Sequence, residues 1–77
     1  MEIKILAFGA VADVLSSGQM ELDNLISTDE LRAYFEKNYP TLKSLSYAIA
    51  INKKIVLGNV NFNNGDEVAL LPPFSGG

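Results

Sequence analysis

The stretch of sequence that decides the fold lies at the C-terminal end of the chain. Residues 65–77 read Gly-Asp-Glu-Val-Ala-Leu-Leu-Pro-Pro-Phe-Ser-Gly-Gly. The alternation over residues 67–71 predicts a strand whose Val68 and Leu70 face the interior. The proline pair ends this strand, because proline has no backbone N–H to donate to a ladder. What remains is a tail of six residues, 72–77, which can span at most about 20 Å.

The residues before this stretch predict one main helix and several more strands. Ser27, followed three residues later by Glu30, forms a capping box that opens a helix over residues 28–39. Pro40 ends the helix, because the residue before a proline is disfavoured in the α conformation. A helical turn is expected at 11–15 and a tight turn at 63–66. Alternating apolar and polar residues predict strands at 2–8, 19–23, 46–52 and 55–57.

This order of elements predicts an α+β fold. A hairpin, a helix and then further strands match the β-grasp, or ubiquitin-like, layout, a mixed sheet of about five strands with one main helix packed across it. In that layout the first and last strands are parallel neighbours at the centre of the sheet. We therefore expect a β-grasp domain over residues 1–71 and a flexible tail over residues 72–77 that carries Gly-Gly.

The composition of the chain excludes several classes of function. The chain has 77 residues and a formal net charge of -3, with no cysteine and no histidine. Cysteine nucleophiles and thiolate metal sites are therefore ruled out, and the commonest general base is missing. We expect no metal site, no bound cofactor and no nucleic-acid partner. We also expect no membrane span and a cytoplasmic location, because the lack of cysteine fits a reducing compartment.

The tail offers a different kind of chemistry. Gly76 and Gly77 have no side chains, so their backbone can thread a narrow channel and present an unhindered terminal carboxyl group. That carboxylate is anionic at pH 7 and is a poor electrophile, so it requires activation from outside. The isolated glycines of this chain form no phosphate-binding loop, so the sequence predicts no ATP site of its own. Because the chain has no cysteine, a transferable group cannot be carried on a thiol, which leaves the C-terminus as the plausible carrier.

One face of the predicted sheet is apolar on the side away from the helix. Leu6 and Phe8 on the first strand, with Ala69 and Leu71 on the last, form a strip beside the root of the tail. An exposed apolar strip of this kind indicates a partner-binding surface. The alternative is a register shifted by one residue, which would place the same side chains in the core.

The final 13 residues resemble the C-terminus of the small, sulfur-carrier subunit of molybdopterin synthase, the MoaD type. The likeness extends more loosely over the whole chain. It includes an opening strand that ends in Phe8, the helix at 28–39, and residues 50–52, Ala-Ile-Asn, similar to the family's Ala-Val-Asn. Thiamine sulfur carriers share the fold and the Gly-Gly ending but typically lack the Pro-Pro pair. The chain therefore looks closer to the molybdenum branch.

The resemblance implies a catalytic cycle in which this chain has no catalytic machinery of its own. A ubiquitin-activating-like adenylyltransferase would use ATP and Mg to adenylate Gly77, and sulfur from a sulfurtransferase would replace AMP to give a thiocarboxylate. The tail would then enter the large synthase subunit, in a heterotetramer, and donate sulfur to the dithiolene of molybdopterin in molybdenum cofactor biosynthesis. Gly76 and Gly77 would be the reacting residues. The tail residues expected to contact the partner are Pro72, Pro73, Phe74 and Ser75.

Three other functions fit the same features. The chain is compatible with a ubiquitin-like protein modifier, with a sulfur carrier for thiazole, cysteine or tungsten-pterin synthesis, and with a β-grasp interaction domain whose Gly-Gly is incidental. Lys53 and Lys54 suit a solvated turn, with a contact to a carboxylate-rich partner or an isopeptide acceptor as the alternatives. Asp66 and Glu67 are adjacent in an extended segment and point to opposite faces, which favours a turn over paired-carboxylate catalysis.

Overall fold

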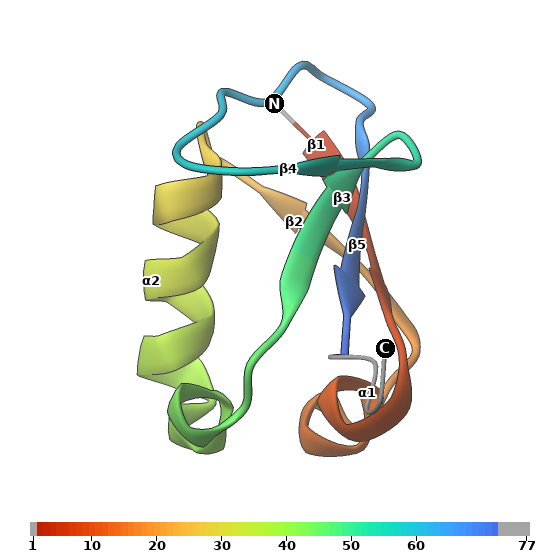
Figure 1. Ribbon diagram of the computed structural model, residues 1–77. Helices are drawn as coiled ribbons and strands as arrows, with labels where there is room; N and C mark the ends of the chain where they lie inside the picture. The colour runs from red at the N-terminus through yellow and green to blue at the C-terminus, as the bar shows by residue number, and fades with distance from the viewer. Residues whose placement is uncertain (1, 73–77) are drawn as a thin grey trace.

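The computed structural model describes residues 2–72. Within this range, five strands, two α-helices and one 3-10 helix follow one another (Figure 1). Their bounds are β1 (Glu2–Ala7), α1 (Gly9–Leu15), β2 (Gln19–Asp23), α2 (Thr28–Asn38), η1 (Pro40–Ser44), β3 (Ala48–Ile51), β4 (Lys54–Val56) and β5 (Glu67–Leu71). Of the predicted tail, only Pro72 belongs to the described residues.

All five strands belong to one mixed sheet with the order β2-β1-β5-β3-β4. β1 and β5 pair in parallel, whereas the other neighbouring strands are antiparallel. In Figure 1, β5 lies between β1 and β3 although it is the last strand of the chain. The predicted mixed sheet with a parallel pair formed by its first and last strands is therefore confirmed.

Helix α2 begins where the capping box predicts. Ser27 is its N-cap and accepts a hydrogen bond from the backbone N–H of Glu30 at 3.4 Å. The Glu30 carboxylate in turn accepts from the backbone N–H of Ile26 at 3.3 Å. The helix ends at Asn38, two residues before Pro40, and the chain continues into η1, which the sequence pattern did not predict. Pro40 suits the first turn of η1, where no backbone N–H donor is needed.

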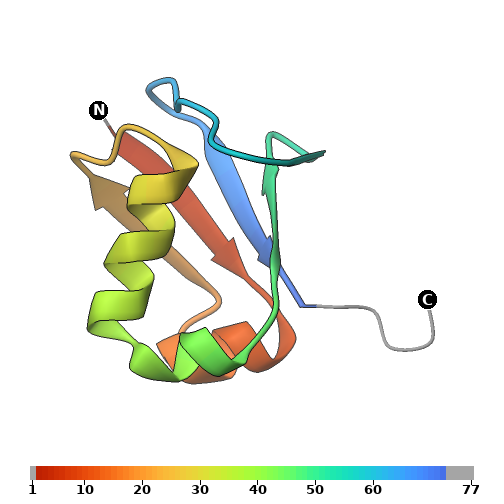
Figure 2. The ribbon, with the colours of Figure 1, turned by 60° about the vertical axis from the view of Figure 1, so that its left-hand side comes forward.

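The core lies between α2 and one face of the sheet, and Figure 2 shows the helix lying across that face. Val68 and Leu70 on β5 are fully buried there, as predicted. Leu31 and Phe35 on α2 are also fully buried and pack on the same cluster. The other buried apolar side chains of this cluster are Ile3, Ile5, Ala7, Val11, Leu15, Leu42, Ile49 and Phe62.

The β3–β4 hairpin is tighter than the sequence pattern predicts. The expected strand over residues 46–52 is confined to 48–51, and β4 begins at Lys54 rather than Ile55. The reason is a two-residue turn, in which Asn52 and Lys53 have φ of 49° and 74°. Positive φ at both central residues is the geometry of a type I′ turn, whose twist matches that of the flanking strands.

Candidate docking surface and tail root

The face of the sheet away from α2 carries an apolar groove of about 440 Å³. It brings together all four residues of the predicted strip, Leu6, Phe8, Ala69 and Leu71. We call this feature the outer groove. Four residues that the sequence reasoning did not assign to it complete the lining: Ala50, Lys53, Ile55 and Glu67.

The strand register explains how the outer groove forms. Ala69 at the middle of β5 pairs with Leu6 on β1 and with Ala50 on β3. Paired residues in neighbouring strands project to the same face of a sheet, so these three side chains form one row. Ala50 in turn pairs with Ile55 on β4, which extends the row to the edge of the sheet.

The missed member Ile55 has a recognisable signal in the sequence. A two-residue turn at 52–53 pairs residue 50 with residue 55, and Ala50 alternates in the sequence with the more strongly apolar Ile49 and Ile51. The turn was expected to include Lys54 as well, so the residue of β3 that pairs with Ile55 was left undetermined. Treating Asn52 and Lys53 alone as the turn would have placed Ile55 beside Ala50.

The outer groove is not part of the core. Phe8 is 46% exposed and Ile55 is 60% exposed, whereas Ile3 and Ile5 on the opposite face of β1 are buried. Leu6 and the outer residues of β5 are half-buried. The one-residue register shift considered above is therefore excluded, and the side chains of the predicted strip face outward.

At one end of the outer groove, a hydrogen-bonded clamp fixes the β3–β4 turn to the start of β5. The Asn52 side-chain amide donates to the buried Asp66 carboxylate at 2.9 Å, and its carbonyl accepts from the backbone N–H of Glu67 at 3.0 Å. The other Asp66 oxygen accepts from the backbone N–H of Asn63 at 2.8 Å. Asp66 therefore stabilises turns, as predicted, while Glu67 lies on the outer groove.

At the opposite end, β5 leads directly into the root of the tail. Pro72 follows Leu71 and lies against Gly9, where a Cβ atom would approach the Pro72 Cγ to 3.2 Å. Gly9 also has a φ of +56°, so its lack of a side chain serves both the backbone conformation and the close approach. The remaining predicted site residues, Pro73, Phe74, Ser75, Gly76 and Gly77, lie outside the described residues.

Comparison with known proteins identifies the family of the chain. The profile of the ThiS family matches residues 5–77, which is nearly the whole sequence. The chain belongs to the ThiS family. A molybdopterin synthase sulfur carrier subunit from Chlamydomonas reinhardtii is 32% identical over the full length of both chains.

Solved structures agree with this assignment. One chain of a complex of subunits 1 and 2 of molybdopterin-converting factor from Helicobacter pylori is 28% identical, covers all of both chains, and has a TM-score of 0.75. The small archaeal modifier protein 1 from Haloferax volcanii matches over all of both chains with a TM-score of 0.81 and 21% identity. The predicted β-grasp fold is therefore confirmed, and this ThiS-family chain is a MoaD-type ubiquitin-like protein.

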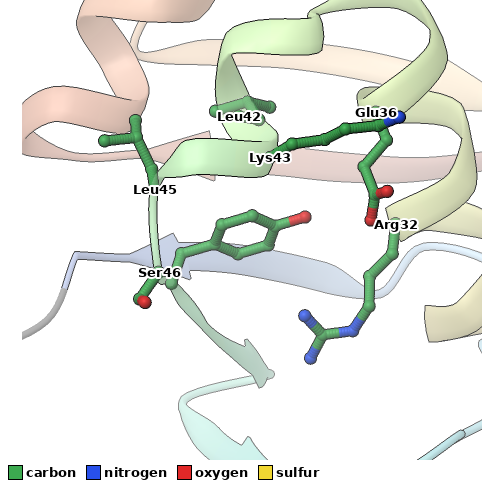
Figure 3. A pocket seen from close by; sticks show the side chains of 7 residues that line it. Arg32, Glu36, Leu42, Lys43, Leu45 and Ser46 are labelled. Atoms are coloured by element: carbon green, nitrogen blue, oxygen red, sulfur yellow. The ribbon is translucent and has the colours of Figure 1, made fainter.

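The ThiS-family chain has a second, polar pocket on the α2 side of the sheet, with a volume of about 480 Å³ (Figure 3). Arg32 and Glu36 reach it from α2, and Lys43 reaches it from η1. The Arg32 guanidinium carbon lies 5.5 Å from the centre of the Tyr47 ring, within range of a cation–π contact. Burial raises the pKa of the Tyr47 phenol, and the nearby Arg32 charge partly opposes this shift. The sequence pattern did not predict this pocket.

Two further properties of this ThiS-family chain concern residues 2–72 only. Within this range, no three acidic side chains come together in a way that could hold a metal ion. No helix among the same residues is long and apolar enough to span a membrane.

Proposed function

We propose that this protein is the sulfur-carrier subunit of molybdopterin synthase and that Gly77 carries the sulfur as a thiocarboxylate. One observation carries the proposal: β5 lines the outer groove with Ala69 and Leu71 and then leads, within one residue, into the segment that ends in Gly-Gly. A surface on β5 and a reactive terminus that follows β5 in the sequence suit a protein that docks and delivers. The identity with the Chlamydomonas sulfur carrier subunit supports this function.

The chemistry starts at the Gly77 carboxylate. The carboxylate attacks the α-phosphate of ATP on an adenylyltransferase, which forms an acyl-adenylate and releases pyrophosphate. Sulfur at the oxidation level of hydrosulfide, delivered by a sulfurtransferase, then attacks the acyl carbon and expels AMP. The product is a thiocarboxylate, and no electrons are gained or lost in either step. ATP and Mg are bound by the activating enzyme, so this chain contributes the acyl group and its accessibility.

The partner in which the tail delivers its sulfur is the large subunit of molybdopterin synthase, where the bound pterin precursor is the sulfur acceptor. The related Helicobacter pylori protein is in a protein–protein complex of subunits 1 and 2, which supports a large-subunit partner for this chain. We place the outer groove against that subunit, because its residues Phe8 and Ile55 are exposed apolar side chains. Docking there would direct the tail, which starts at Pro72, toward the partner's active site. The partner's own residues would supply acid and base catalysis.

Intact mass spectrometry tests this function. The full chain is incubated with ATP, Mg, the cognate adenylyltransferase and a sulfur source, and its mass is compared with that of a chain lacking Gly77. We expect a gain equal to the difference between sulfur and oxygen, present only in the full chain. An unchanged mass with an activating enzyme that demonstrably forms the adenylate would contradict sulfur carriage. Stable high-mass conjugates to lysines of other proteins would instead identify a protein modifier.

A further inference from the structure

Lys53 has a backbone conformation that does not suit its side chain. Its φ is 74°, at the second central position of the β3–β4 turn, where type I′ turns favour glycine. Asn52, at the first central position, tolerates positive φ and uses its side chain in the clamp to Asp66 and Glu67. Lys53 lacks the tolerance of asparagine for positive φ, because its Cβ atom makes the left-handed conformation unfavourable. Such strain is a reason to ask what the side chain does.

The Lys53 side chain lies at the outer groove. It lines the groove together with Ile55 and Glu67, at the end remote from the tail root. The neighbouring Lys54 does not line the groove, and it pairs with Ile51, which packs against the core on the opposite face. The two adjacent lysines are both exposed, but only Lys53 is directed to the proposed docking surface.

The backbone of the β3–β4 turn that carries Lys53 is held by hydrogen bonds to β5. The Asn52 backbone N–H donates to the Glu67 carbonyl at 2.7 Å, in addition to the side-chain clamp described above. The turn is therefore tied to the first residue of β5. Glu67, the acidic residue on this part of the groove, pairs in register with Lys4 on β1. Glu67 therefore has a cationic neighbour on the outer face, Lys4, besides Lys53.

We propose that Lys53 is a specificity-determining residue of the outer groove, whose ammonium group pairs with a carboxylate at the rim of the large subunit. This inference rests on the proposed function. A partner that covers the apolar groove necessarily approaches the ammonium group and withdraws water from it. A cation in that position is tolerated only if the partner supplies an opposite charge. Lys53 therefore selects a partner with an acidic rim at the end of the groove opposite the tail root.

Affinity for the purified large subunit, measured at two ionic strengths, tests the proposal with Lys53→Glu and Lys54→Glu as a matched pair. Both substitutions change the net charge equally at adjacent exposed positions. We expect Lys53→Glu to weaken binding at least about tenfold at about 0.05 M salt, and much less at about 0.5 M. Lys54→Glu should change affinity less than about twofold at either salt concentration. Equal effects of the two substitutions would overturn the proposal.

Lys53→Gly separates the role in binding from a role in folding. Relief of the positive-φ strain should raise the melting temperature by about 4 °C, while loss of the ammonium group weakens binding about threefold or more. A variant that melts higher and binds as tightly as the wild type would overturn the proposal. A merely structural role for Lys53 would move stability and affinity in the same direction.

The exchanged variant Lys53→Glu with Glu67→Lys tests whether the two residues serve only each other. Restoration of wild-type affinity would assign Lys53 to a pair within the chain and overturn the proposal, whereas persistent weak binding supports it. Failure of the wild-type chain to bind the large subunit would overturn both this inference and the proposed function. Binding that is lost in Phe8→Ala but equal in the two lysine variants would overturn only this inference.

Discussion

The two faces of the sheet are made by the same strands and have different roles. On the inner face, β5 contributes Val68 and Leu70, which are fully buried beneath α2. On the outer face, the alternate residues Ala69 and Leu71 are also apolar, but they line a groove that no helix of residues 2–72 covers (Figure 2). Apolar character alone therefore does not assign a residue of β5 to the core. One face holds the fold together, and we assign the other to docking.

The largest expected effect comes from breaking the inner face. Phe35→Ala removes a fully buried ring that contacts the Tyr34 and Tyr39 rings at centroid distances of 5.4 and 6.0 Å. Such a truncation costs about 3 to 5 kcal/mol, which is comparable to the whole stability of a domain of this size. We expect the variant to be largely unfolded at 37 °C by circular dichroism. A cooperative melt close to that of the wild type would show that the inner face does not hold the fold.

Breaking the outer face should affect binding without affecting folding. Phe8 is 46% exposed and makes no side-chain capping bond to α1, so Phe8→Ala removes little from the folded domain. Phe8 is an aromatic residue of the proposed docking surface, so Phe8→Ala should weaken binding to the large subunit about 30-fold. Leu57→Ala is the control, because Leu57 is 89% exposed and lies outside the groove. Equal affinities of the two variants would argue against docking at the groove.

A third test concerns the place where the tail root meets the domain. Gly9 and Gly58 both have positive φ, but only at Gly9 would an added Cβ atom crowd another residue, Pro72. Gly58→Ala should therefore cost about 1 kcal/mol from the backbone alone. Gly9→Ala should cost roughly twice as much, because it adds the contact with Pro72. Urea denaturation measures both, and equal costs would show that the packing of Pro72 on Gly9 contributes nothing.

The smallest expected effect is at the polar pocket on the inner side. The folded-state pKa of Tyr47 is raised above 10.0, its ordinary value, chiefly by burial. The unfolded chain therefore loses this proton first, so the contribution of Tyr47 is complete below about pH 10 and is lost as the pH rises through the folded pKa. We expect the wild type to lose more stability than Tyr47→Phe between about pH 9 and 11. Parallel losses would show that Tyr47 does not titrate differently on folding.

Much of the fold could be predicted because local signals agreed with the tertiary structure. The Ser27 to Glu30 capping box marks the start of α2, and the proline pair marks the end of β5. The predicted bounds of β2 and β5 agree with the structure. Strict alternation over residues 2–8 and in β5 was sufficient to assign inner and outer faces, and from these the four residues of the strip. The strand predicted over 2–8 ends at Ala7, and Phe8 is the N-cap of α1, where its extended backbone continues the alternation.

The parts that could not be predicted depend on contacts distant in sequence or on unfavourable local geometry. Lysine rarely adopts the left-handed conformation that Lys53 has here. The register of the β3–β4 hairpin, and with it the place of Ile55 on the outer groove, was therefore not predicted. The 3-10 helix η1 and the polar pocket depend on how the segment after Pro40 packs against α2. No local pattern in the sequence encodes that packing.

Single-turnover sulfur transfer measures directly whether Gly77 delivers sulfur to the pterin. The purified chain, converted to the thiocarboxylate at Gly77, is mixed with the large subunit and the pterin precursor, cyclic pyranopterin monophosphate, and both products are followed by mass spectrometry. We predict that the chain returns to its carboxylate mass as dithiolene sulfur appears in the pterin, and that Phe8→Ala slows this transfer while Leu57→Ala does not. A thiocarboxylate that persists beside a large subunit active with its own small subunit would contradict the account.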